Sequence, residues 1–334
     1  MIQVLEFSFA LLPIVIFLIG MWMLDSFQLI KTREVIITIL FGFLIAGITV
    51  LFHGTILNNT GIDRAALSRY IAPVSEEFLK FLPVIFLIVT RRVGFMVDAA
   101  IFGLAVGAGF AIIENLYYLR ALEDATLITW FVRGFGTAIM HGCTTAIAAI
   151  ISKDLFDTKD WPAMISFVPG FLLAVVLHAL FNMFLLPPTT SALLITISLP
   201  PVLYLVFKKS EAHTRSWLGT GLDSDMELLQ ILLAGNISQT RIGGYIQSIR
   251  DKFPPAVVGD IICYLRVYLE LSIKAKGILI MKDSGVELPP DPDVEAQFEE
   301  LEYLESQIGK IGLLAIQPLL KIDNTDLWQL SLMR

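Results

Sequence analysis

The stretch Glu76-Glu-Phe-Leu-Lys-Phe-Leu-Pro-Val-Ile-Phe-Leu-Ile-Val89 places two adjacent glutamates at the start of an otherwise apolar run. A run of this kind is expected to cross a bilayer, where one carboxylate near the middle costs roughly 2.5–3.5 kcal/mol. Lys80 follows one helical turn later and can reach either Glu76 or Glu77. Because charge at such a position is expensive, the stretch predicts a membrane helix that carries a functional site.

The rest of the chain supports a membrane protein with a separate tail. Its 334 residues are 56% hydrophobic and 16% charged, with a mean hydropathy of +0.74, whereas soluble domains are about 25% charged. The apolar excess ends near Lys208. We therefore expect an all-α fold: a polytopic helical bundle over residues 1–209 and a soluble domain over 210–334.

Seven segments are long and apolar enough to span a bilayer, which takes about 20 residues. All are expected to be helices, because the hydrocarbon leaves backbone polar groups no other partners. The predicted spans are Phe7–Leu24, Val35–His53, Tyr70–Val89, Phe95–Leu119, Ile128–Ile151, Met164–Leu186 and Ala192–Phe207.

Lysine and arginine pairs follow the first, third, fifth and seventh of these spans, and the other connections are poorer in positive charge. Positive loops stay on the cytoplasmic side. The pattern predicts a multi-pass protein of the cell membrane with its N-terminus outside and its tail in the cytoplasm.

Polar residues of four spans share one depth in this topology. Glu76, Glu77, Glu114, His178 and Asn182 fall in the outer half of the membrane, and His141 lies nearer the middle. Small residues beside Glu114 at helical spacing allow another helix to approach closely. Each polar residue alone could serve helix packing, and Arg133 could simply neutralise a glutamate. His53 ends its span and His213 lies in the tail, so neither is expected in the site.

These residue types suit the activation of water. One of Glu76 and Glu77 could act as general base while a neighbouring carboxyl group holds a proton. Histidine and asparagine could donate to the oxyanion that forms when water attacks a peptide carbonyl. Alternatively, Glu77, His141 and His178 could bind zinc, since two histidines, one glutamate and a water form a known catalytic set. Neither a His-Glu-x-x-His nor a Gly-x-Ser-x-Gly motif is present.

Four motifs in order resemble the PrsW family of intramembrane proteases: Ser-Glu-Glu-Phe-Leu-Lys (75–80), Ile-Glu-Asn-Leu-Tyr-Tyr (113–118), His141 and His-Ala-Leu-Phe-Asn (178–182). That family is similar to the CAAX prenyl proteases and bacteriocin-processing enzymes. The resemblance covers about residues 35–207 and implies a protease that needs no cofactor and uses Glu76 and Glu77 on water. It assigns a catalytic role also to Glu114, His141, His178 and Asn182, and we expect Lys80, Arg133, Asn115 and Tyr118 to support the site. It further implies a membrane-anchored substrate, such as an anti-sigma factor cut on its outer side during stress signalling.

The tail is acidic, with 11 Lys and Arg against 18 Asp and Glu over residues 210–334. This charge argues against nucleic acid and anionic lipid as its partners. Helical periodicity appears in Met226–Ala234, Val257–Ile280 and Val294–Leu314, with Phe298, Leu301 and Leu304 on one side of the last. We expect a helical docking or regulatory domain with a possible cytoplasmic partner.

A third interpretation belongs to another class of protein. The same polar cluster could serve a proton-linked transporter or a membrane sensor without enzymatic activity. Transporters often show internal repeats and broken helices, and the sequence contains no evident repeat.

Overall fold

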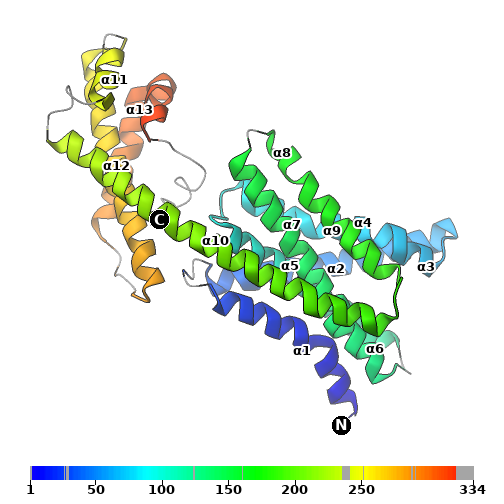
Figure 1. Ribbon diagram of the computed structural model, residues 1–334. Coiled ribbons are helices and arrows are strands. Elements are labelled where there is room, and N and C mark those ends of the chain that lie inside the picture. The colour runs from blue at the N-terminus through cyan, green and yellow to red at the C-terminus, as the bar shows by residue number, and fades with distance from the viewer. Residues whose placement is uncertain are drawn as a thin grey trace. The chain divides into compact units, whose positions relative to one another are not determined.

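The computed structural model describes residues 2–320, apart from 26, 28–29, 123–124, 160, 235–240, 251, 287–288 and 290. All regular elements in this part of the chain are helices (Figure 1). In chain order they are α1 (Ile2–Met23), α2 (Thr32–Thr60), α3 (Arg64–Ala66), η1 (Leu67–Ile71), α4 (Ala72–Val89), α5 (Met96–Ala121), α6 (Leu127–Phe131), η2 (Val132–Ala138), α7 (Ile139–Thr158), α8 (Ala163–Ser166), α9 (Val168–Asn182), α10 (Pro188–Leu233), α11 (Arg241–Arg250), α12 (Pro255–Asp283) and α13 (Asp293–Leu320). The predicted all-α class is therefore confirmed.

The chain forms two compact units, Met1–Glu211 and Ala212–Arg334. Their boundary falls inside α10, which continues for 46 residues without interruption. The predicted seventh span ends at Phe207, but the helix does not end there. The predicted separate helix Met226–Ala234 is instead the last part of α10.

Six helices of the described chain are long and apolar enough to cross a membrane. They begin at Gln3, Thr32, Met96, Leu127, Ala163 and Pro188. The predicted third span, which contains α4, is not among them, because three ionisable side chains lie within its 18 residues. The count of seven spans stays a prediction, and α4 is the helix on which it depends.

Helices α5 and α7 form the centre of the first unit. About 83% of the apolar window in α5 is buried, against 33% or less in α1, α2 and α10. A close approach makes this possible: a Cβ atom on Gly103 of α5 would lie 2.7 Å from the carbonyl oxygen of Thr145 in α7. Only glycine fits there, so the two helices that carry Glu114 and His141 pack backbone to backbone.

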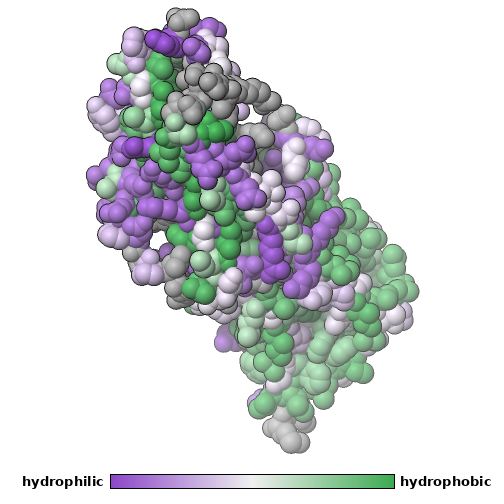
Figure 2. All heavy atoms as spheres, turned by 60° about the vertical axis from the view of Figure 1, so that its left-hand side comes forward, coloured by the Kyte–Doolittle hydropathy of each residue, from purple (hydrophilic) through white to green (hydrophobic). Residues whose placement is uncertain are grey.

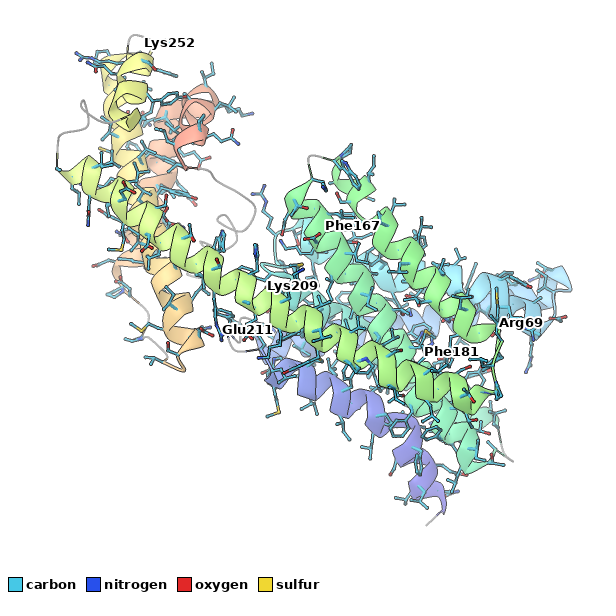
Figure 3. All side chains as sticks on the ribbon, viewed as in Figure 1. Arg69, Phe167, Phe181, Lys209, Glu211 and Lys252 are labelled. Carbon is cyan, nitrogen blue, oxygen red and sulfur yellow. The ribbon has the colours of Figure 1, made fainter. Side chains whose placement is uncertain are left out.

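Two π-helical segments flank the polar residues of the bundle. The segment η1 leads directly into α4, and η2 leads into α7 and carries Arg133. Such segments are rare and frequently occur at functional sites. Helix α9 begins after Phe167 and ends just beyond Phe181, both labelled in Figure 3.

The second unit has its own apolar core. The end of α10 packs with α12 and α13, and the predicted side of α13 with Phe298, Leu301 and Leu304 is buried. In Figure 2, hydrophilic side chains predominate on the surface of this unit, whereas apolar ones predominate on the helices of the first. Residues 321–334 of the predicted tail domain lie outside the described residues.

Candidate active site

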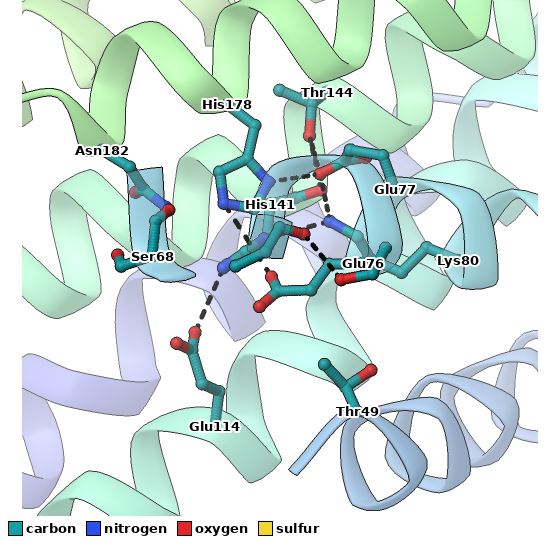
Figure 4. Close-up of polar contacts among 12 residues, drawn as sticks. Thr49, Ser68, Glu76, Glu77, Lys80, Glu114, His141, Thr144, His178 and Asn182 are labelled. Carbon is teal, nitrogen blue, oxygen red and sulfur yellow. Dashed lines mark hydrogen bonds and ion pairs between the residues drawn. The ribbon is translucent and has the colours of Figure 1, made fainter. Parts of the chain in front are cut away.

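Glu77 points from α4 into the bundle and is fully engaged (Figure 4). Its Oε1 lies 2.5 Å from Lys80 Nζ and 2.8 Å from His178 Nδ1. Thr144 of α7 donates to the same oxygen at 3.4 Å. Glu77, Lys80 and His178 are all buried. A buried ion pair is tolerated when hydrogen bonds satisfy its remaining polar atoms. Through these contacts the Glu77 carboxylate joins α4 to α7 and α9.

His141 of α7 lies between a cation and an anion. Its Nδ1 is 3.0 Å from Lys80 Nζ, and its Nε2 is 3.1 Å from Glu114 Oε2. An ammonium group can only donate. We therefore assign a neutral imidazole that accepts at Nδ1 and donates from Nε2 to Glu114. The ring also stands at 88° to that of His178, with 4.8 Å between centroids.

Glu114 of α5 has its own cationic partner. Arg133 of η2 approaches Glu114 Oε1 to 3.2 Å and donates from Nε to Asn115 Oδ1 at 2.8 Å. The guanidinium lies over the ring of Tyr118, 3.8 Å from its centroid. Asn115 in turn donates to the carbonyl of Ala10 in α1 at 2.7 Å. The predicted supporting residues thus form a connected group around Glu114.

Glu76 differs from the other two glutamates. Its Oε2 is buried and has no hydrogen-bond partner within the described part of the chain. Its ion-pair partners are histidines: Nε2 of His178 lies 3.8 Å from Oε2, and Nδ1 of His53 lies 3.9 Å from Oε1. Glu77 and Glu114 are each matched by a lysine or arginine. Glu76 is the carboxylate left to act on something else.

The residues fit a metal ion. One donor atom each from Glu76, His141 and His178 lie within 4.8 Å of one another. The predicted ligand set named Glu77, and the geometry replaces it with Glu76, because Glu77 Oε1 is already held by Lys80 and His178. By accepting from His178 Nδ1, Glu77 leaves Nε2 directed at Glu76, which is how carboxylates orient zinc-binding histidines. Two ligands of one zinc ion are at most about 4.2 Å apart. The 3.8 Å between His178 and Glu76 lies within that limit, whereas the three donor atoms together lie only within 4.8 Å and would have to draw closer to bind the ion.

Asn182 lies apart from this group. Its side chain donates to the backbone carbonyl of Ser68 in η1 at 3.0 Å. The structure thus uses the predicted oxyanion donor to hold α9 against the π-helical segment that precedes α4. A carbonyl in a π-helical turn is easily left without a partner, so this bond helps to fix the start of α4.

His53 belongs to the site, contrary to the sequence prediction. Its Nε2 lies 2.9 Å from the hydroxyl of Ser75, and its Nδ1 faces Glu76. The sequence feature that could have revealed His53 was its predicted depth in the membrane. His53 ends the second predicted span on the same side of the membrane from which the third begins. Thr144, which contacts Glu77, gave no comparable signal, because threonine is common in apolar helices.

Three glutamates and three histidines from α2, α4, α5, α7 and α9 thus gather inside a bundle of apolar helices. The model of the PrsW family intramembrane metalloprotease matches residues 31–207, more than half of the chain. The chain therefore belongs to the PrsW family and is a multi-pass intramembrane protease. This decides against the transporter and sensor interpretation. Searches of the curated proteins and of the solved structures gave no match.

Proposed function

We propose that this protease hydrolyses a peptide bond of a membrane-anchored protein at the point where Glu76, His141 and His178 converge. The observation that carries the proposal is the buried, unpaired Oε2 of Glu76 opposite Nε2 of His178. Both atoms present electron pairs to the space between them. A water molecule that donates to both, or a cation that binds both, would satisfy them.

Each residue has a distinct task in this proposal. Glu76 takes the proton from the attacking water. The residues around Glu76 hold its carboxylate close to that water. Glu77 is a positioning residue, because it fixes the tautomer of His178 and the place of Lys80. Glu114 holds His141, and Arg133 keeps Glu114 ionised and in place. Lys80 supplies positive charge near the developing oxyanion.

A divalent metal ion is favoured by the donor set of one glutamate and two histidines. Bound there, a zinc ion would polarise the scissile carbonyl and supply hydroxide near neutral pH. Glu76, His141 and His178 would hold it. In the tautomer assigned above, His141 would offer the lone pair of Nδ1, which now accepts from Lys80, and would keep its Nε2–H bond to Glu114. Without a metal ion, Glu76 alone takes the proton from the water.

The substrate is inferred from the chemistry of the location. The alternating lysine and arginine pairs support a site in the outer half of the bilayer, so the cleaved bond lies near the outer end of the substrate's anchor. A single-span signalling protein of the anti-sigma-factor kind fits this position. The acidic second unit supports a cytoplasmic regulatory or docking role.

The experiment is substrate trapping followed by cleavage. Glu76→Gln keeps the shape of the side chain and removes its basicity, so it should retain a membrane-anchored substrate that the wild type cleaves. Glu6→Gln, in α1 and away from the cluster, is the matched control and should cleave normally. Cleavage of the trapped protein by Glu76→Gln at the wild-type rate would contradict the proposal.

Metal content decides between the two forms of the mechanism. Purified wild type should contain about one zinc ion per chain, and Glu76→Gln or His178→Ala should contain far less. Full activity after strong chelation, with no metal bound, would leave the glutamate-only form.

A further inference from the structure

A long apolar groove lies between α2 and α4, within the first unit. It has a volume of about 490 Å³. Its walls are Ile37, Phe41 and Ile48 of α2 and Leu82 and Phe86 of α4, and Phe102 of α5 contributes to its lining. The wall residues are substantially exposed: Phe41 is 48% and Phe86 57% accessible. Exposed apolar side chains are expected wherever a membrane helix faces lipid, so what distinguishes this surface is its concave shape, which suits an apolar partner.

The packing of α2 explains why the groove exists. Gly42 of α2 lies against the backbone of α5, where a Cβ atom would meet the Phe110 amide at 2.8 Å. This contact holds the backbone of α2 directly against α5 at Gly42. Helices α2 and α4 therefore stand on either side of a channel with Phe102 at its base.

The groove and the candidate active site lie along the same boundary between α2 and α4, which we call the seam. Ile48 and Leu79 line the groove. His53 lies five residues beyond Ile48, and Ser75 lies one turn before Leu79. The bond between His53 and Ser75 is the only side-chain hydrogen bond that joins α2 to α4 among the described residues. Just behind it is Glu76, whose Oε1 is 3.9 Å from His53.

We infer that this seam receives the membrane-spanning helix of the substrate, with His53 and Ser75 closing its end at the active site. The inference rests on the proposed function, because the groove leads to Glu76. From Ile37 to His53 the seam spans 17 residues, or about 24 Å of helix, close to the thickness of the hydrocarbon. An apolar helix lying along it would place its outer end beside Glu76.

This length and this continuity favour a substrate helix over a lipid chain. An anionic lipid headgroup would favour an unopposed cation, whereas the polar end of the groove carries both Glu34 and Arg92. A protein helix presents its own side chains to both charges. Separation of His53 from Ser75 would then admit the unwound end of the helix to Glu76.

The test obstructs the groove with tryptophan side chains and compares the cleavage of two substrates. Ile48→Trp and Leu82→Trp obstruct the groove, whereas Leu44→Trp is a matched control on α2 that is 58% exposed and does not line it. The substrates are the membrane protein trapped by Glu76→Gln, in vesicles, and a soluble peptide that covers only its cleavage sequence. The peptide is too short to lie along the groove.

We expect Ile48→Trp and Leu82→Trp to raise KM for the membrane substrate at least tenfold and to leave peptide cleavage unchanged. Leu44→Trp should match the wild type with both substrates. Unchanged cleavage of the membrane substrate in both groove variants overturns the inference, as does an equal loss with Leu44→Trp or with the peptide. Failure of the wild type to cleave either substrate would instead refute the proposed function on which the inference rests.

Discussion

The imidazole Nδ1 of His178 lies 2.8 Å from the carboxylate of Glu77, and this bond determines which ring nitrogen is directed at the reacting centre. Because Glu77 accepts at Nδ1, the Nε2 lone pair is directed toward Glu76. Two adjacent glutamates of one helix thus serve different purposes. Glu77 faces the bundle interior and organises it, and Glu76 faces the space where water or metal can bind.

Replacing Glu77 should therefore damage activity through His178. In Glu77→Gln the amide group would present hydrogens to Lys80 or to His178 Nδ1, both of which donate. We expect kcat/KM to fall about 10–100-fold, the range for residues that orient a catalytic ligand. The double variant Glu77→Gln with Lys80→Met relieves the buried charge, so it should regain thermal stability without regaining activity. Recovery of both together would show that Glu77 acts only through stability.

The approach of α5 to α7 should be intolerant of any side chain at Gly103. In Gly103→Ala the new methyl group would collide with backbone atoms of Thr145 and Ala146. Overpacking against backbone should cost about 3 kcal/mol and displace His141, so both the free energy of unfolding and the cleavage rate should fall. The control is Gly47→Ala in α2, where the methyl group meets nothing within 4 Å. Helix propensity predicts that this control gains about 0.5–1 kcal/mol.

Helical periodicity and hydropathy were enough to predict the bundle and to bring most of the site together. Depth in the membrane grouped Glu76, Glu77, Glu114 and His178, because residues at equal depth on packed helices meet. Depth does not specify rotation about the helix axis. For that reason the sequence could not tell which of the paired glutamates would face Lys80.

The missed features depend on contacts between helices far apart in sequence. His53 meets Ser75 only because Gly42 fixes α2 on α5, and no local pattern reveals that packing. Asn182 was expected to face the glutamates, but the π-helical turn at Ser68 offered a backbone carbonyl that needed a donor. The continuation of α10 past Lys208 was missed because charge, which ends a membrane segment, does not end a helix.

Arg133 should matter most as the counter-ion of Glu114. In Arg133→Ala the half-buried carboxylate loses its cation and Tyr118 loses its stacked partner. Loss of one member of such a pair is strongly destabilising, and we expect on the order of 2–3 kcal/mol, below the full range for a buried pair because Glu114 is partly exposed. Adding Glu114→Gln should restore part of this stability, which a double-mutant cycle in detergent measures. Strictly additive losses would contradict a direct pairing.

The second unit should respond to alkaline pH through Tyr264. Burial, with Glu305 nearby, raises the pKa of its hydroxyl to about 12 from the usual 10. The neutral form is thus favoured in the folded state, so its stabilisation is complete below pH 10 and is lost as pH rises from about 10 to 12. Tyrosinate absorbance should include a late titration that Tyr264→Phe removes. Titration of that tyrosine at its ordinary pKa would contradict its burial.

The contact between His53 of α2 and Ser75 of α4 should depend on their hydrogen bond. His53→Ala removes the bond to Ser75, whereas His53→Gln can still reach the hydroxyl group. Because separation of His53 from Ser75 admits the substrate, we expect His53→Ala to cleave the membrane substrate several-fold faster and His53→Gln to match the wild type, with similar thermal stability in both. Equal activity in the two variants would contradict a role of the hydrogen bond between His53 and Ser75 in the mechanism.

The most direct measurement of the central claim is kcat/KM of purified wild type and Glu76→Gln on one membrane substrate in the same bilayer. Removing a carboxylate that activates water should lower the rate by about 10²–10⁴-fold, while the thermal unfolding profile stays that of the wild type. A Glu76→Gln enzyme that cleaves at the wild-type rate would contradict the assignment of Glu76 as the residue on which catalysis depends.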